Sequence, residues 1–121
     1  MMIARMLTIA GFIAACCTAV AAEDIAGRYA VKGTLVNGYT YLVSAEIVMT
    51  SETTCDVNWS DHSKGVCLLD GTTLYMASIV QGKPQLGIYQ IAPDGSMEGV
   101  LTDNLQGRSG NIYREKLTPV E

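Results

Sequence analysis

Basic and catalytic side chains are scarce in this chain of 121 residues. Eight Lys and Arg stand against twelve Asp and Glu, which gives a formal net charge of −4, and there is one histidine. Binding to a nucleic-acid backbone or to an anionic membrane surface needs clustered positive charge, so we expect neither partner. Hydrophobic residues make up 49% of the chain, too many for a disordered protein, and the length suits one domain.

The chain also lacks the patterns that accompany common catalytic and cofactor sites. None of its glycine-containing turns precedes a helical segment, which excludes a phosphate-binding loop. The single His62 lies between Asp61 and Ser63 in an expected turn, where adjacent side chains point in different directions, so these residues do not form a triad. Two cysteines and one histidine give at most three metal ligands at no familiar spacing. We therefore predict no catalytic residue, no metal and no cofactor.

Long apolar runs are absent except at the N-terminus. Arg5 precedes an apolar stretch over residues 6–17, and small residues follow as far as Ala22. This order is typical of a secretory signal peptide, so residues 1–22 are predicted to be the leader and 23–121 a single β-barrel domain. The apolar stretch is shorter than the roughly 20 residues that span a bilayer. No membrane span is expected.

An alternative processing signal overlaps the leader. Residues 13–16 read Ile-Ala-Ala-Cys, which resembles a bacterial lipobox with Cys16 as the acylated residue. A lipid anchor at Cys16 therefore stays open beside simple cleavage after Ala22. Either route exports the domain, so we expect a periplasmic, cell-surface or secreted protein.

Two of the four cysteines, Cys55 and Cys67, lie in the mature domain. In an oxidising compartment such a pair is most simply one disulfide, which would stabilise the fold by roughly 3 kcal/mol. The strand register predicts the same bond independently. If residues 60–62 form a hairpin loop, Trp59 lies opposite Ser63 and Cys55 lies opposite Cys67, with Trp59 buried on the face that carries Cys55.

Short runs rich in Val, Ile, Tyr and Thr, separated by turn residues such as Asn-Gly and Asp-Gly, predict an all-β protein. Short connections between consecutive strands favour an antiparallel meander, and closure into a barrel removes the exposed sheet edges. A two-sheet sandwich is the alternative. Glycines inside strands suit the coiling of a small barrel. The expected strands lie near residues 28–35, 40–49, 54–59, 64–70, 73–80, 85–92, 96–102 and 111–118.

The interior of a small eight-stranded barrel is nearly filled by side chains, which leaves room for a small ligand at most. Alternation places Glu115 on the same side of the last strand as Tyr113 and Leu117, so this carboxylate is predicted to face inward. It could orient a ligand or be held by a neighbouring Tyr, Trp or Arg. Tyrosine suits ligand mouths and protein-binding patches. The candidate binding or interior residues are Trp59, Tyr41, Tyr89, Tyr113 and Glu115.

Several motifs occur in the same order as in a known protein family. They are Gly-Arg-Tyr at 27–29, Gly-Tyr-Thr-Tyr at 38–41, Val-Asn-Trp at 57–59 and Gly-Ile-Tyr-Gln-Ile-Ala-Pro-Asp-Gly at 87–95. The chain resembles a family of small exported bacterial proteins, most of them uncharacterised and some labelled fibronectin-binding. The resemblance implies a host extracellular-matrix protein as partner. Together with the missing catalytic patterns and the tyrosine-rich interior, it predicts a non-catalytic binding or interaction module of the bacterial envelope, whose partner is a protein or a small apolar ligand.

Two other functions stay open at this point. Ser109-Gly110 followed by Tyr113 is similar to a loop of periplasmic lysozyme inhibitors, so inhibition of a secreted enzyme is an alternative. A protruding loop that fits an active-site cleft would support it. A small enzyme is the other alternative, and it would need a convergent cluster of polar side chains.

Overall fold

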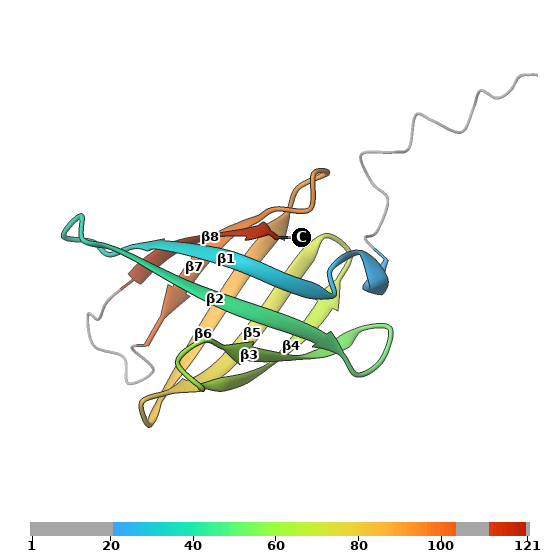
Figure 1. The fold of residues 1–121 in the computed structure, drawn as a ribbon, viewed down its shortest axis with the longest axis horizontal. Helices are drawn as coiled ribbons and strands as arrows, with labels where there is room; N and C mark the ends of the chain where they lie inside the picture. Colours follow the sequence, from blue (N-terminus) through green and yellow to red (C-terminus); the bar gives the residue numbers. More distant parts are fainter. Residues whose placement is uncertain (1–20, 104–111, 121) are drawn as a thin grey trace, which may run out of the picture.

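The computed structural model describes residues 21–103 and 112–120, and in them eight antiparallel strands close into one barrel (Figure 1). The predicted meander and its closure are confirmed, and the sandwich alternative is wrong because β1 pairs with both β2 and β8. The predicted signal peptide, apart from its last two residues, and Cys16 lie outside the described residues. The elements are η2 (Ala22–Asp24), β1 (Gly27–Thr34), β2 (Thr40–Met49), β3 (Thr54–Trp59), β4 (Lys64–Asp70), β5 (Thr73–Val80), β6 (Lys83–Ile91), β7 (Met97–Thr102) and β8 (Ile112–Pro119).

The turn between β5 and β6 differs from the sequence-based expectation, which centred it on residues 82–84. Gln81 and Gly82 form the turn, both at positive φ, and Lys83 already pairs with Val80. Pro84 therefore lies in β6, although proline cannot donate to a sheet ladder. It is tolerated because β7 pairs with β6 only from Leu86 onward, so none of the described strands on that side needs the missing N–H.

One end of the barrel is closed. The short helix η2 leads into Ile25, which is 1% exposed and belongs to the core. The Tyr29 hydroxyl donates a hydrogen bond to the Ile25 carbonyl oxygen at 2.8 Å, which fixes the segment that precedes β1. The C-terminal strand ends near the same place, where the Val120 amide bonds to the Arg28 carbonyl (Figure 1). We call this the closed end.

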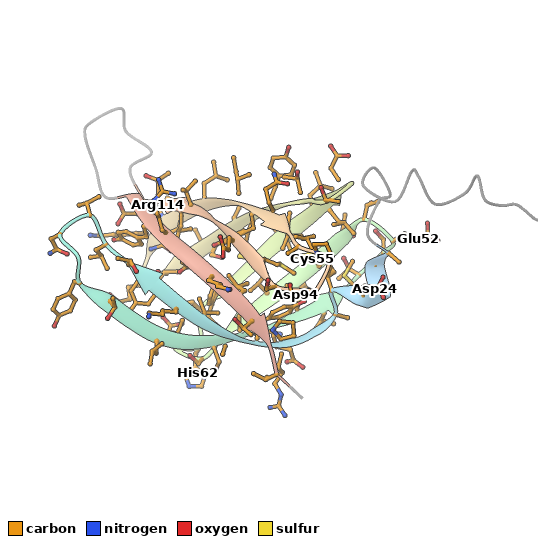
Figure 2. All side chains as sticks on the ribbon, turned by 90° about the horizontal axis from the view of Figure 1, so that it is seen from above. Asp24, Glu52, Cys55, His62, Asp94 and Arg114 are labelled. Atoms are coloured by element: carbon orange, nitrogen blue, oxygen red, sulfur yellow. A yellow bond between two sulfur atoms is a disulfide. The ribbon has the colours of Figure 1, made fainter. Side chains whose placement is uncertain are left out.

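The opposite end carries the turns that follow β1, β3 and β5, and we call it the mouth. Asp24 and Glu52 mark the closed end in Figure 2, and Arg114 marks the mouth. The core is concentrated between the closed end and the middle of the barrel. It comprises Ile25, Tyr29, Val31, Ala45, Ile47, Cys55, Val57, Cys67, Leu69, Leu74, Met76, Tyr89, Ile91, Met97 and Leu117.

The predicted disulfide is present. Cys55 on β3 lies opposite Cys67 on β4, and the two sulfur atoms are bonded. The register follows from the hairpin as expected, because the Trp59 amide donates to the Ser63 carbonyl oxygen at 2.9 Å. Both cysteines are buried in the barrel core, so the bond joins neighbouring strands from inside.

The outer wall is apolar over part of the sheet. β4 to β7 expose large hydrophobic side chains to solvent, and the neighbouring strands place these side chains in continuous rows. We call this surface the outer apolar face. It consists of Val66, Leu68, Tyr75, Ile79, Leu86, Ile88 and Val100.

Candidate functional site

A cavity of about 170 Å³ opens at the mouth. Its walls come from strands that are far apart in the sequence, since β2, β3, β5, β6, β7 and β8 all contribute. Four of the five predicted candidate residues, Tyr41, Trp59, Tyr113 and Glu115, line it together. Tyr89 is fully buried beneath them. The remaining lining residues are Val43, Ser60, Asp61, Val80, Gln85 and Leu101.

The carboxylate of Glu115 is the buried polar centre of this site. The side chain is 5% exposed, so the predicted inward face of the last strand is confirmed. One carboxylate oxygen accepts a hydrogen bond from the Tyr89 hydroxyl at 2.7 Å, and the other accepts one from the Tyr41 hydroxyl. Hydrogen bonds to an ionised acceptor are stronger than neutral ones, so the two tyrosines hold the carboxylate in place.

Two glycines make this arrangement possible. Gly33 on β1 lies between Tyr41 and Glu115 in one row across the sheet, and Gly99 on β7 lies between Glu115 and Tyr89. A Cβ at Gly33 would lie 2.0 Å from Cζ of Tyr41. Because the glycine leaves that space empty, the Tyr41 ring reaches across β1 to the carboxylate. The row therefore alternates polar side chains with glycines.

Burial and the nearby carboxylate act on the tyrosines in the same direction. Burial raises the pKa of Tyr41 and of Tyr89 well above the ordinary value of 10.0, and the hydrogen bond to Glu115 and its charge raise each pKa further. Burial alone raises the pKa of Tyr29 to about 12. All three hydroxyls therefore stay protonated and able to donate at neutral pH.

These shifts predict a loss of stability in alkali. The folded protein holds Tyr29 neutral up to about pH 12, whereas the unfolded chain ionises it near 10.0, so its contribution to stability is complete below pH 10 and disappears as the pH rises toward 12. Tyr41 and Tyr89 act in the same sense. We expect the free energy of unfolding, measured with denaturant, to fall across this range. Tyrosinate absorbance should appear at a higher pH in the folded protein than in the unfolded chain. Ionisation of all tyrosines in one step near pH 10 without unfolding would contradict this assignment.

Trp59 and Tyr113 complete the aromatic wall of the cavity. Trp59 shares the inner face with Cys55 as expected, but it is half-buried rather than buried, because it lies at the mouth end of β3. Its indole Nε1 donates to Oγ of Ser78 at 3.1 Å. The Tyr113 ring meets the Tyr41 ring edge to face, with centroids 6.3 Å apart, and its hydroxyl donates to Asp103 at 3.1 Å. Hydrogen bonds thus hold all three aromatic rings of the cavity wall, Trp59, Tyr41 and Tyr113.

The predicted turn that carries Asp61 and His62 is present between β3 and β4. His62 is exposed at positive φ and its side chain points away from the barrel (Figure 2). The Asp61 carboxylate accepts the Ser63 amide at 2.9 Å, and this hydrogen bond lowers the pKa of Asp61. Within residues 21–103 and 112–120, no group of three or more His, Cys, Asp or Glu side chains is placed to hold a metal ion.

Replacing Glu115 by glutamine should destabilise the protein. The amide keeps the shape but removes the charge that strengthens both tyrosine hydrogen bonds, so the free energy of unfolding at neutral pH should fall by about 1–3 kcal/mol. Denaturant titration measures the change. Glu46→Gln is the matched control, because Glu46 is exposed on the outside of β2 and should tolerate the same change. An unchanged stability in Glu115→Gln would mean that the carboxylate is solvated.

No family model and no curated protein matches the chain. Several solved structures share its fold. A redesigned β-barrel named mFAP1, bound to DFHBI, has a TM-score of 0.67 at 16% identity and covers 80% of this chain and 96% of its own. A second redesigned β-barrel has a TM-score of 0.67 at 18% identity, with 83% and 95% of the two chains covered. A fluorescence-activating β-barrel designed de novo has a TM-score of 0.61 at 18% identity, with 82% and 96% covered. At these identities the chain is similar to them in fold.

Proposed function

We propose that the protein is a non-catalytic binding module of a bacterial envelope that takes a small ligand into the mouth of its barrel. The observation that carries the proposal is the cavity itself, which is walled by Trp59, Tyr41 and Tyr113 and has one buried carboxylate, Glu115, in its lining. Binding sites of this kind combine an apolar wall with a few fixed polar groups. One barrel of similar fold is bound to the small molecule DFHBI, which supports the same use of this interior.

Export is part of the proposal. The leader pattern of residues 1–22 and the disulfide between Cys55 and Cys67 support an oxidising location. Within the described ranges, none of the helical segments has the length and apolar character to cross a membrane. A host extracellular-matrix protein as partner rests on the family resemblance and remains a second proposal. The inhibitor alternative depends on Ser109 and Gly110, which lie outside the described residues.

The binding proposal can be tested with the intrinsic fluorescence of Trp59, the only tryptophan in the chain. A cavity of about 150 Å³ holds a molecule of the size of benzene, so the panel should contain soluble aromatic and aliphatic compounds of that size. We expect at least one compound to shift the emission saturably and to raise the melting temperature by mass action.

A variant that fills the cavity provides the control. Val43→Phe should abolish the fluorescence response, because Val43 lines the mouth, while Leu42→Phe on the outer side of the same strand should leave it unchanged. A panel without any response, or a response that survives Val43→Phe, would overturn the proposal.

A further inference from the structure

The described lining of the cavity carries charge of one sign. Among its described lining residues are two carboxylates, Glu115 and Asp61, and none is Lys, Arg or His. A third carboxylate, Asp103, accepts the Tyr113 hydroxyl behind the wall. Aromatic faces also carry partial negative charge, so Trp59 and the tyrosines add to the same field. The cavity therefore favours a positively charged occupant.

Glu115 makes this preference specific. The described part of the chain places no cation in an ion pair with its carboxylate, which is 5% exposed and bonded only to the two tyrosine hydroxyls. Removing a charge from water without an opposite charge is costly, and neutral donors offset only part of that cost. Each carboxylate oxygen accepts one tyrosine and keeps a lone pair for a further donor or cation.

The aromatic residues supply the rest of such a site. A cation over the face of Trp or Tyr is attracted by the ring quadrupole, most strongly where water is excluded. Trp59 and Tyr41 are held by hydrogen bonds to Ser78 and Glu115, so their orientations are fixed before a ligand arrives. The cavity volume of about 170 Å³ limits the occupant to a small molecule.

We propose that the mouth binds a small organic ammonium ion, with Glu115 as the counter-charge and Trp59, Tyr41 and Tyr113 as the aromatic wall. This inference rests on the proposed binding function and names the chemical class of the ligand. It goes beyond the apolar ligand that the aromatic residues alone suggest.

Two probes of equal shape test the inference. Choline carries the charge, and 3,3-dimethylbutan-1-ol is its neutral carbon counterpart. We expect choline to quench or shift Trp59 emission with an affinity at least about tenfold higher than the alcohol, in line with a desolvated cation–π contact. Glu115→Gln should remove this preference, and Glu46→Gln should keep it. Asp61→Asn provides a second variant at an exposed position of the lining, in case Glu115→Gln does not fold.

The outcomes separate the two proposals. Equal binding of both probes would overturn the ammonium inference and leave the proposed function standing. A preference for choline that survives both substitutions would overturn the role of the carboxylates. If neither probe binds at millimolar concentration, the ammonium inference fails, and the wider panel described above decides the proposed function separately.

A different observation concerns the outer apolar face. Its exposed fractions include 59% for Val66, 55% for Ile79 and 48% for Leu68, which is unusual for neighbouring hydrophobic side chains on one wall. Hollows of about 580 and 390 Å³ lie on it, and both are lined by Val66, Ala77 and Leu86. The small side chain of Ala77 therefore leaves a dent in the face.

The face is complementary to itself. One row of paired residues runs across β4, β5 and β6 and consists of the buried positions Cys67, Met76 and Gly87. Consider two copies of the protein in contact through this face, related by a twofold axis that runs along the row between them. Each strand would then lie antiparallel against the same strand of the second copy. The large side chain of Tyr75 would then meet the dent at Ala77.

The same operation pairs opposite charges. On β4 the outward residues are Lys64, Val66, Leu68 and Asp70 in that order, so the basic end of one copy meets the acidic end of the other. We infer that this protein forms a twofold dimer through the outer apolar face. Closed twofold contacts of this kind use one patch on both subunits.

Sedimentation of the full exported protein tests the dimer. We expect a dimer whose dissociation constant rises at least about 100-fold in Ala77→Arg, since the dent would then hold an unpaired charge. Leu42→Arg is the control, because Leu42 is exposed on β2 outside this face. A carbodiimide cross-link between Lys64 and Asp70 of two copies would support the register. A monomeric wild type, a dimer that survives Ala77→Arg, or a face occupied instead by lipid vesicles or a matrix protein would overturn it.

Discussion

Replacing Gly99 by alanine is expected to lower the free energy of unfolding by about 3 kcal/mol, at the upper end of the range for overpacked cores. A Cβ at this position would lie 2.0 Å from the Ile88 carbonyl oxygen and 2.7 Å from Cα of Tyr89, both backbone atoms of β6. Backbone in a sheet cannot move aside as a side chain does, so β7 would have to separate from β6. Denaturant unfolding measures the loss.

Gly87→Ala provides a graded comparison for this change. There the added Cβ would meet the ring of Tyr89 at 2.8 Å, which is a side chain rather than backbone. We expect a smaller loss of stability than in Gly99→Ala. Equal and small losses of stability in both variants would mean that the backbone of β6 does not approach Gly99 of β7 as closely as described. A Gly99→Ala protein that keeps its stability would also break the explanation of how Tyr89 and Glu115 meet.

Removing the disulfide by Cys55→Ala together with Cys67→Ala should lower the free energy of unfolding by about 3 kcal/mol. The bond closes a loop with a sequence separation of 12 and lies in the core, so the variant loses both the chain constraint and two buried sulfur atoms. Thermal and denaturant unfolding of the oxidised protein and the variant measure the difference.

A reducing agent supplies the internal control for this experiment. It should destabilise the wild type toward the level of the double variant and leave the variant unchanged. Non-reduced peptide mapping of the exported protein should find Cys55 linked to Cys67. Two free thiols in that sample would contradict the assigned bond, whatever the stability of the variant.

The strands and the disulfide were predictable because both depend on local pattern. Alternating side chains and turn residues define each hairpin, and the hairpin at residues 60–63 sets the register that joins Cys55 to Cys67. The same alternation places Glu115 inward without any knowledge of its partners. The β5–β6 turn was misplaced because proline is common in turns and Pro84 was assigned to one. Pro84 can lie in β6 because the pairing of β7 with β6 stops at Leu86, which the sequence does not indicate.

The site itself could not be assembled from the sequence. Tyr41, Glu115 and Tyr89 lie on β2, β8 and β6, with β1 and β7 between them, so their meeting depends on how β8 pairs with both neighbours. Residues 104–111 precede β8, and their sequence is not a short turn that would predict how β8 pairs with β7. The interior glycines were the available signal. Placed in one row with Tyr41 and Glu115, Gly33 and Gly99 indicate where side chains reach across the barrel.

The outer apolar face also escaped the sequence analysis. Alternation identifies which residues share a side of a strand, but a strand with apolar residues on both sides gives no indication of which side is buried. β5 and β6 are of this kind, since Ile79, Leu86 and Ile88 are exposed while Leu74, Met76 and Tyr89 are buried. Closure of the barrel decides between the two sides.

The closed end has a practical consequence for how the protein is presented. Both ends of the described chain, Ala21 and Val120, lie at that end, opposite the mouth. An affinity tag or a coupling to a sensor surface joined next to Ala21 or Val120 would therefore start from the side opposite the cavity. Immobilised through either terminus, the protein should keep the mouth directed toward the solution, which makes it suited to surface-based measurements of ligand capture without a redesigned linker.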